Sequence, residues 1–327
     1  MMERRKSLLI RMTISFVLLG VVPLAAAGTA LLGHLKDNME RVVLDDMGRM
    51  VSYGGKHAEE MAEEYSGLTK YIYDVSTDDG MFLYQILKSP GLSQEERKME
   101  ITLLLSDMLD WDSRLRTVCF MDQKGRIYYA TRNAQKILDE DTFRYRIGKE
   151  DEEGNFSVLS PHLDDYFQDS GNQVITFRRS YQDITSFMTI EDCLGFFYVD
   201  IDIGRLSSAF SDLDMGLSGS FYIMDDNGAC IYSVDSAGTG KAADSMASLI
   251  PSMNQGTGSL LKDGNYVVYE RLEPYGWTVA AKVPQDQVLN MGSTIRYTAV
   301  FLGAVFLALL CLYCHNYISL HLYKDAV

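Results

Sequence analysis

The chain has 327 residues, 47% of them hydrophobic, with 45 Asp and Glu against 30 Lys and Arg. This length allows two ordinary domains, or one elongated domain with membrane segments. The formal net charge of −15 at pH 7 excludes a protein that binds nucleic acid through a basic surface.

The first predicted element is a transmembrane helix over residues 8–33. Its only charge is Arg11, and it is long enough to cross a bilayer as a helix. Pro23 is tolerated in a membrane helix, usually with a kink. The alternative is a cleaved signal peptide, which the basic residues in 1–7 and the small residues at 25–28 fit in part. Because the apolar run is longer than a usual signal sequence and continues directly into helical sequence, we expect an uncleaved anchor.

A long stalk helix is predicted over residues 34–78. Apolar or small residues recur there at spacings of three and four, the period of one helix face. Over about 40 residues such a helix extends ~60 Å. The stripe can pack on the chain's own domain or pair with a second copy in a homodimer, and we expect both, at different heights. We interpret His57 on this stripe as a core residue. The stripe consists of Val43, Met47, Met50, Gly54, His57, Met61, Tyr65, Leu68, Ile72 and Val75.

A membrane-distal module is predicted over residues 79–213. Ser93 and Glu96 have the spacing of a capping box at the start of a helix. Residues 133–172 are polar and acidic, and we expect surface loops and short helices there. Strands are predicted from runs of β-branched and aromatic residues. The expected elements are helices at 81–88, 93–109 and 204–213, and strands at 116–122, 126–131, 173–184 and 193–203.

A membrane-proximal module is predicted over residues 214–284, and it repeats a motif of the first module. Met-Asp-x-x-Gly occurs at 121–125 and at 224–228, each time followed by Ile-Tyr. Asp accepts local backbone hydrogen bonds in a turn and Gly supplies a positive φ, so both copies predict a tight hairpin. Acidic residues are too few and wrongly spaced for a calcium loop. The expected elements are strands at 219–225, 229–234, 257–262, 265–272 and 276–283, and a helix near 241–252.

Residues 285–296 are predicted to form an exit helix that continues into a second transmembrane helix over 297–314. This second run carries no charge and has tyrosines near both ends, where interfacial aromatic residues are expected. The basic residues before the first span place the N-terminus in the cytoplasm. Residues 34–293 are therefore expected outside the cell membrane, and residues 315–327 in the cytoplasm.

The five cysteines do not predict disulfides. Cys119, Cys193 and Cys230 each lie in or beside an apolar strand pattern, and an odd number without close spacing is poor evidence for a disulfide framework. We interpret them as small buried side chains. Cys311 and Cys314 form a C-x-x-C pair inside the second span, where packing is favoured over a redox or metal role because other ligands are lacking.

These elements, in this order, resemble the double Cache sensor regions of bacterial membrane receptors. GFFYVDIDIGRLSSAF (195–210) is similar to the strand that closes the distal module and the linking helix after it. SGSFYIMDDNGACIYSVDSAGTG (218–240) resembles the opening of the proximal module, and YGWTVAAKVPQDQV (275–288) its last strand. SFVLLGVVPL (15–24) is similar to first anchors of that group, and VITFRRSYQD (174–183) resembles a distal strand of YesM/LytS-type sensor histidine kinases.

The resemblance implies an α+β fold of two tandem PAS-like antiparallel-sheet modules on a long N-terminal helix, flanked by two transmembrane helices. It implies a sensor in a bacterial cell membrane that binds a small extracellular molecule. The amino-acid-binding subclass has an Asp-x-Arg-x-x-Trp-Tyr-like signature, which Trp111 and Arg114 do not reproduce, so no amino-acid ligand is implied. Residues 315–327 are too short for the usual helix pair and kinase, cyclase or chemoreceptor output. Either the gene is truncated, the sequence is a fragment, or the output lies on a separate chain.

Candidate ligand residues lie in the distal module. Strand alternation places Arg179 on a face made otherwise of Ile, Phe and Tyr. Because an unpaired cation is costly there, Arg179 is the first candidate for an anionic ligand group. The alternative is an internal salt bridge with an acidic residue of 149–169. Further candidates are Tyr181, Phe177, Tyr128, Tyr129, Tyr145 and Tyr166.

No catalytic constellation, metal site or cofactor motif is apparent, so no enzyme activity or cofactor is predicted. The favoured hypothesis is the sensor half of a signalling receptor, with the bilayer, a small ligand and a second copy as partners. A ligand-free structural or protein-docking ectodomain is the second hypothesis. An extracytoplasmic enzyme is the third, without support in the sequence.

Overall fold

The computed structural model divides the chain into two compact units. One comprises Met1–Met47, Leu261–Tyr266 and Val283–Val327, and the other Gly48–Leu260 and Val267–Lys282. The residues described are 2–132, 137–147, 155–167, 170–183, 193–204, 210, 219–235, 246–253, 256–291, 297–298, 300–306, 308–309, 312–313 and 316.

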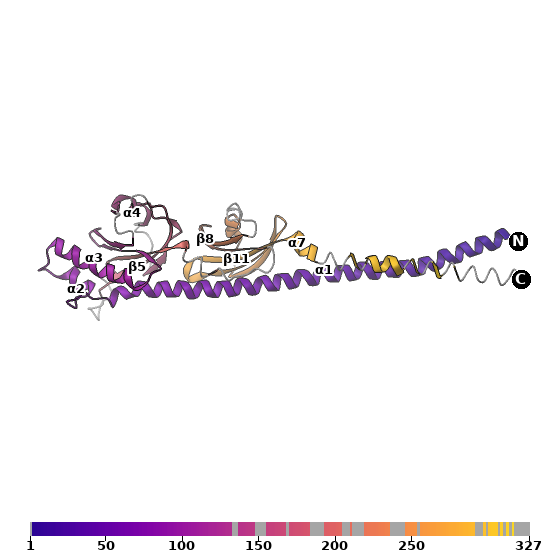
Figure 1. Ribbon diagram of the computed structural model, residues 1–327, viewed down its shortest axis with the longest axis horizontal. Helices are drawn as coiled ribbons and strands as arrows, with labels where there is room; N and C mark the ends of the chain where they lie inside the picture. Colours follow the sequence, from indigo (N-terminus) through magenta and orange to yellow (C-terminus); the bar gives the residue numbers. More distant parts are fainter. Residues whose placement is uncertain are drawn as a thin grey trace. The chain divides into compact units, whose positions relative to one another are not determined.

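A single helix, α1 (Met2–Lys70), begins the chain (Figure 1), and the 3-10 helix η1 (Tyr71–Tyr73) follows it. The helix ends at Lys70 rather than at the Asp-Asp-Gly turn after Thr77, because the backbone tightens to i→i+3 bonding in the aromatic run that follows. In the second unit the predicted stripe is buried in the chain's own core. Its buried members there are Gly54, Met61, Tyr65, Ile72 and Val75, whereas Met50, His57 and Leu68 are half-buried.

The opposite face of α1 is acidic. Glu59, Glu60, Glu63 and Glu64 are all exposed. Like charges brought together at a helix pair are unfavourable, so this part of α1 offers no apolar seam to a second copy. The homodimer stays a prediction.

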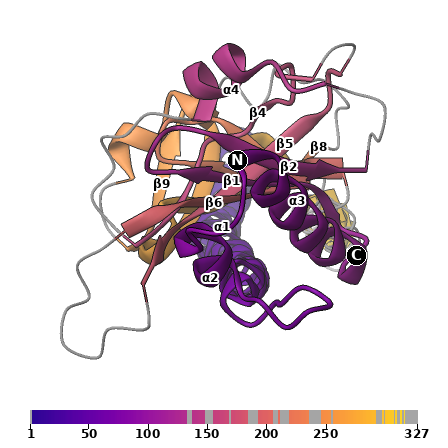
Figure 2. The ribbon, with the colours of Figure 1, turned by 90° about the vertical axis from the view of Figure 1, so that its left-hand side faces the viewer.

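The distal module is a six-stranded antiparallel sheet with helices on both faces. Its strand order is β2-β1-β6-β5-β3, and β4 also pairs with β5. The second part of α1 and helix α3 cover one face, and α4 lies over the other (Figure 2). The elements are α2 (Leu83–Lys88), α3 (Gln94–Trp111), β1 (Leu115–Asp122), β2 (Ile127–Thr131), α4 (Glu140–Ile147), β3 (Phe156–Val158), β4 (His162–Leu163), β5 (Gln173–Gln182) and β6 (Cys193–Asp202).

The predicted capping box at the start of α3 is confirmed. The Glu96 amide donates to Ser93 Oγ at 3.2 Å, and the Ser93 amide donates to Glu96 Oε2 at 2.8 Å. Two amides that the helix cannot satisfy are paired in this way. Ser93 therefore fixes where α3 begins.

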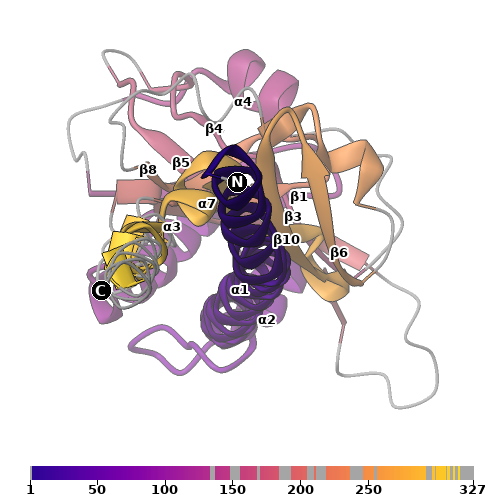
Figure 3. The same cartoon turned by 90° about the vertical axis from the view of Figure 1, so that its right-hand side faces the viewer.

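The proximal module is a five-stranded antiparallel sheet in the order β8-β7-β11-β10-β9. Residues of α1 lie against β10 (Figure 3): a Cβ at Gly55 would lie 3.3 Å from Glu270 Oε2. Gly54 approaches the Phe221 ring so closely that a Cβ would clash at 2.5 Å. The elements are β7 (Ser220–Asp225), β8 (Cys230–Asp235), η2 (Ile250–Ser252), β9 (Thr257–Lys262), β10 (Asn265–Leu272), η3 (Glu273–Tyr275), β11 (Trp277–Pro284) and α7 (Gln285–Met291).

Both predicted Asp-x-x-Gly hairpins are present. Gly125 between β1 and β2 has φ 73°, and Gly228 between β7 and β8 has φ 80°. Asp122 Oδ1 accepts the amides of Lys124 and Arg126 at 2.9 Å. The same residue types therefore build the same turn in both modules.

The predicted membrane spans at 8–33 and 297–314 stay predictions. Across the part of the chain that the structure describes, no helix is both long and apolar enough to cross a bilayer. Many side chains of both runs, including Cys311 and Cys314, lie outside the described residues. The three cysteines between them are free thiols; Cys119 is buried as predicted, whereas Cys193 and Cys230 are half-buried.

Candidate functional site

The distal sheet presents two chemically different faces. Strand β5 alternates between them, with Phe177 and Arg179 toward α1 and Thr176 and Arg178 toward α4. Arg179 Nε donates to Thr69 Oγ1 at 2.6 Å, and its Nη2 donates to Ser66 Oγ at 3.0 Å. Both hydroxyls belong to α1, so the first candidate residue joins the sheet to the stalk helix.

Three other candidates lie on the same α1-facing side. Phe177 packs on Tyr65 with ring centroids 5.5 Å apart. Tyr181 stacks on Tyr73 at 4.6 Å. Tyr128 is buried and stacks on Phe120. These contacts form the core between sheet and helices, and a ligand role for these residues and for Arg179 stays a prediction.

The remaining candidates divide between the α4-facing side and the surface. Tyr166 is fully buried there. Tyr129 packs at the edge of the same cluster, where its hydroxyl accepts the Leu138 amide at 3.3 Å. Tyr145 on α4 is 76% exposed. Only Tyr129 and Tyr166 of the predicted set therefore meet on this face.

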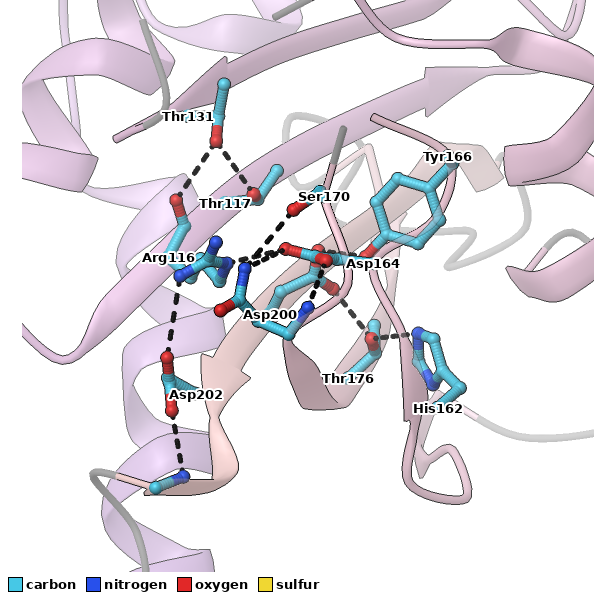
Figure 4. Close-up of polar contacts among 12 residues, drawn as sticks. Arg116, Thr117, Thr131, His162, Asp164, Tyr166, Ser170, Thr176, Asp200 and Asp202 are labelled. Carbon is cyan, nitrogen blue, oxygen red and sulfur yellow. Dashed lines mark hydrogen bonds and ion pairs between the residues drawn. The ribbon is translucent and has the colours of Figure 1, made fainter. Parts of the chain in front are cut away.

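A buried carboxylate, Asp200 of β6, lies at the centre of the α4-facing side (Figure 4). Tyr166 donates its phenolic hydrogen to Asp200 Oδ2 at 2.5 Å, and Thr176 donates to Oδ1 at 2.6 Å. Burial raises the pKa of the Asp200 carboxyl, and the charge of His162 and these two donors oppose that rise. A carboxylate with two hydroxyl partners at 1% exposure is an unusual group to bury.

His162 of β4 reaches the same cluster through Thr176. Its Nε2 lies 3.3 Å from Thr176 Oγ1, and its Nδ1 lies 2.8 Å from the carbonyl oxygen of Ser160. Strand β4 has two residues and pairs only with β5. A short strand thus holds an ionisable ring beside the buried acid.

A second buried carboxylate, Asp164, is paired with a cation. Arg116 Nε donates to Asp164 Oδ2 at 2.6 Å, and the Asn172 amide donates to Oδ1 at 2.8 Å. Burial alone would raise the pKa of Asp164, but hydrogen bonds from Ser170, Arg116 and Asn172 lower it. Arg116 also contacts Asp202 at 3.4 Å (Figure 4). The two buried acids of this face are therefore shifted in opposite directions.

Apolar side chains surround these polar groups. The cluster beneath α4 includes Phe143, Tyr198 and Cys119, each at most 2% exposed. Burial, with the charge of Asp200 adding to it, raises the pKa of the Cys119 thiol well above its usual value. Arg178 is buried with its guanidinium carbon 4.3 Å from the Phe196 ring centre. The low-dielectric surroundings strengthen each hydrogen bond of Asp200.

The sequence analysis missed Asp200, His162 and Asp164. A usable indication was present in CLGFFYVDID, where alternation puts Asp200 on the face of Phe196 and Tyr198. Asp is depleted in strands, so a carboxylate at that position needs a specific partner. Nothing in the sequence indicated that His162 and Asp164 would lie beside it.

Surface clefts add little to this site. A cleft of about 520 Å³ between α3 and the edge strand β2 is lined by Ser106, Leu109, Asp110 and residues 129–132. Of the predicted candidates it contains only Tyr129. Within the described residues, no group of three or more His, Cys, Asp or Glu side chains could hold a metal ion.

Comparison with known proteins identifies the fold. No family model and no curated protein matches the sequence. The sensory domain of the Campylobacter jejuni chemoreceptor Tlp3 (CcmL) with isoleucine bound matches with a TM-score of 0.54 at 13% identity, covering 78% of this chain and 97% of that chain. The ligand-binding domain of Mlp24 with asparagine matches with a TM-score of 0.53 at 13% identity, covering 78% of this chain and 98% of that chain. The chain thus shares its fold, over most of its length, with solved sensory domains.

Proposed function

We propose that this chain is the sensor region of a bacterial membrane receptor, which binds a small extracellular molecule and transmits a signal to a cytoplasmic partner. The fold carries this proposal, because it matches ligand-bound sensory domains over 78% of the chain. Helices over 8–33 and 297–314 anchor the protein, and residues 34–293 lie outside the membrane. Its role is binding, not catalysis.

The ligand site is the α4-facing side of the distal sheet. Asp200, Tyr166 and Thr176 bring a carboxylate and two hydroxyls together in an apolar setting. A ligand that offers a hydrogen-bond donor or a positive charge can replace one hydroxyl as a partner of Asp200. Tyr129 lies at the edge of the same cluster and contributes an aromatic wall.

The signal leaves the distal sheet through α1. Arg179 ties β5 to Ser66 and Thr69, as described above. Just before β1, Arg114 contacts Glu64 Oε1 at 2.6 Å, and its guanidinium lies 5.2 Å from the Tyr65 ring centre. A small change in the sheet therefore reaches the last turns of α1, and tilting, rotation or a piston shift of that helix carries it onward.

A ligand-free ectodomain is the second candidate, and one observation favours it. The α4-facing side is occupied by the chain's own Phe143, Tyr166 and Tyr198, each at most 2% exposed. In that case the distal module serves as a rigid spacer or as a docking surface for another protein.

Thermal unfolding of the full chain in detergent, with a panel of small molecules, tests the proposal. The panel contains amino acids, amines, carboxylic acids, sugars and nucleobases. A ligand at about 100 times its Kd stabilises the protein by about 2.7 kcal/mol, or roughly 5–10 °C for a domain of this size. A panel without any shift would support the ligand-free candidate.

Two variants locate the site once a ligand is found. On the proposal above, Asp200→Asn abolishes the ligand-induced shift and Arg179→Ala preserves it. The reverse result would move the site to the α1-facing side, where Arg179 is the predicted ligand residue.

A further inference from the structure

The hydrogen bonds around Thr176 constrain where protons can be. Thr176 Oγ1 has one hydrogen and lies 2.6 Å from Asp200 Oδ1 and 3.3 Å from His162 Nε2. The carbonyl oxygen of Ser160, 2.8 Å from His162 Nδ1, can only accept. Nδ1 therefore carries a hydrogen, and the remaining question is what Nε2 carries.

With neutral His162 and ionised Asp200, the network is one hydrogen short. Both Nε2 and Asp200 Oδ1 are then acceptors, and Thr176 can donate to only one of them. One added proton satisfies every atom in either of two arrangements. The imidazolium donates to Thr176, which donates to Asp200, or the Asp200 carboxyl donates to Thr176, which donates to His162.

Several other ionisable groups on this face have partners of their own. Tyr166 donates to Asp200 Oδ2, Asp164 and Asp202 both contact Arg116, and Arg146 of α4 pairs with Asp165. Cys119 of β1 is a buried thiol, and Arg178 of β5 lies over Phe196. Among these contacts, none supplies the missing hydrogen to Thr176, His162 or Asp200 Oδ1.

We propose that His162, Thr176 and Asp200 together bind a single proton, and that this proton holds β4 against the distal sheet as a pH-responsive latch. Strand β4 is suited to this role because it is two residues long and β5 is its only strand partner among the described residues. Backbone hydrogen bonds from Leu159 to Thr176 and from Asp164 to Asn172 flank it. The segment after it carries Asp164 and Tyr166, which contact Arg116 and Asp200. Loss of the proton leaves a buried acceptor unpaired and loosens this cover of the α4-facing side.

The latch acts in one direction of pH. The unpaired acceptor exists only in the folded cluster, because water satisfies both groups in an unfolded chain, in which His and Asp titrate at about 6.5 and 3.9. The bound proton therefore stabilises the folded state fully below about pH 6.5, and this contribution is lost as pH rises above that value. Burial raises the pKa of the Asp200 carboxyl, so burial also favours the protonated cluster.

Urea unfolding of the full chain in detergent, between about pH 5.5 and 9, tests the latch without any ligand. In the native protein the unfolding equilibrium constant should rise by up to tenfold per pH unit from about pH 6.5 upward, and level off once the folded cluster has lost its proton. Asp200→Asn, His162→Gln and Thr176→Val should each flatten that alkaline rise, and Thr176→Ser, which keeps the hydroxyl, should restore it. The exposed His34→Gln is the control and should leave it unchanged. An alkaline rise that survives in Asp200→Asn and His162→Gln would overturn the proposal.

Hydrogen exchange on the native sequence covers the case in which a variant fails to fold. Amides of 160–167 should lose protection as pH rises, after correction for intrinsic exchange, while amides of the β7–β8 hairpin should not. Equal behaviour of the two segments would refute the latch. Neither measurement depends on the small-molecule panel, so the proposed receptor function and the latch can fail separately.

Discussion

The two modules share a topology but bury different chemistry at equivalent positions. Aligning the repeated Met-Asp-x-x-Gly turns pairs Thr117 with Ser220. Since Thr117 lies opposite Asp200 and Ser220 lies opposite Lys282, the buried acid of the distal sheet corresponds to a half-buried lysine of the proximal sheet. The matching face of the proximal module is an apolar cluster with Met224, Met246 and Met253. Backbone pairing thus sets the fold, while single positions on one face decide whether polar or apolar side chains are buried there.

The hairpin turns differ in the same way. Asp122 Oδ2 accepts Arg126 Nε at 2.6 Å, whereas Ala229 occupies the corresponding place after Asp225. Asp225 Oδ2 is buried and has no hydrogen-bond partner among the described residues. Both turns therefore have the backbone hydrogen bonds to Oδ1, but only the distal turn has an ion pair at Oδ2.

Truncating the α4 side chain that packs on the α4-facing side of the distal sheet should have the largest effect on stability. Phe143 of α4 is fully buried, and Phe143→Ala should lower the free energy of unfolding by about 4 kcal/mol because a large cavity replaces the ring. Urea unfolding of the full chain measures this. Tyr145→Ala, at an exposed position of the same helix, should change stability by less than about 0.5 kcal/mol. Equal losses would mean that α4 does not pack as described.

Breaking the arginine pair of each module compares a buried with an exposed contact. Arg116→Met leaves Asp164 buried without its cation and should cost about 3 kcal/mol. Arg271 pairs with the half-exposed Asp226 of the proximal module, so Arg271→Met should cost less than about 1 kcal/mol. Denaturant unfolding at neutral pH measures the loss in the free energy of unfolding for both variants. Similar costs would show that the Arg116–Asp164 pair is no better shielded from solvent than the Arg271–Asp226 pair.

Acidification should act through Asp164 and not through Asp200. The folded pKa of Asp164 lies below its unfolded value of about 3.9, so its stabilising contribution is present above that value and lost as pH falls through the folded pKa. Asp164→Asn should therefore flatten the acid limb of the stability profile. Asp200→Asn should leave that limb intact, since the pKa of Asp200 is shifted upward. If the loss of stability at low pH is the same in Asp164→Asn as in the native protein, Asp164 is not its cause.

The smallest effect should come from giving the proximal turn the arginine that the distal turn has. Ala229→Arg places a guanidinium near Asp225 Oδ2 and should add about 0.5–1 kcal/mol. Ala229→Met, of similar length without charge, is the matched control. A gain in the methionine variant that equals the gain in the arginine variant would attribute the effect to packing.

The sequence by itself determined most of the elements and their order, but it predicted loops and short helices where β3 and β4 lie and extended α1 beyond Lys70. Period-two runs predicted β5 and β6, the Asp-x-x-Gly repeats predicted both hairpins, and Ser93 with Glu96 predicted the start of α3. These features depend on local backbone geometry and side-chain spacing, which nearby residues fix. The fold class was predictable for that reason.

Only the tertiary structure decided which face of the distal sheet α1 covers and which face holds the buried polar groups. Alternation showed that Arg179 and Thr176 point to opposite faces, but not that α1 would cover the side of Arg179 and meet it with Ser66 and Thr69. Similarly, His162, Thr176 and Asp200 come from three consecutive strands, with separations of 14 and 24 residues between the contacting pairs. Their meeting depends on long-range packing and pairing, which spacing along one segment cannot specify. Strand alternation therefore gave two equivalent faces, and the packing of α1 against one of them left the other as the candidate site.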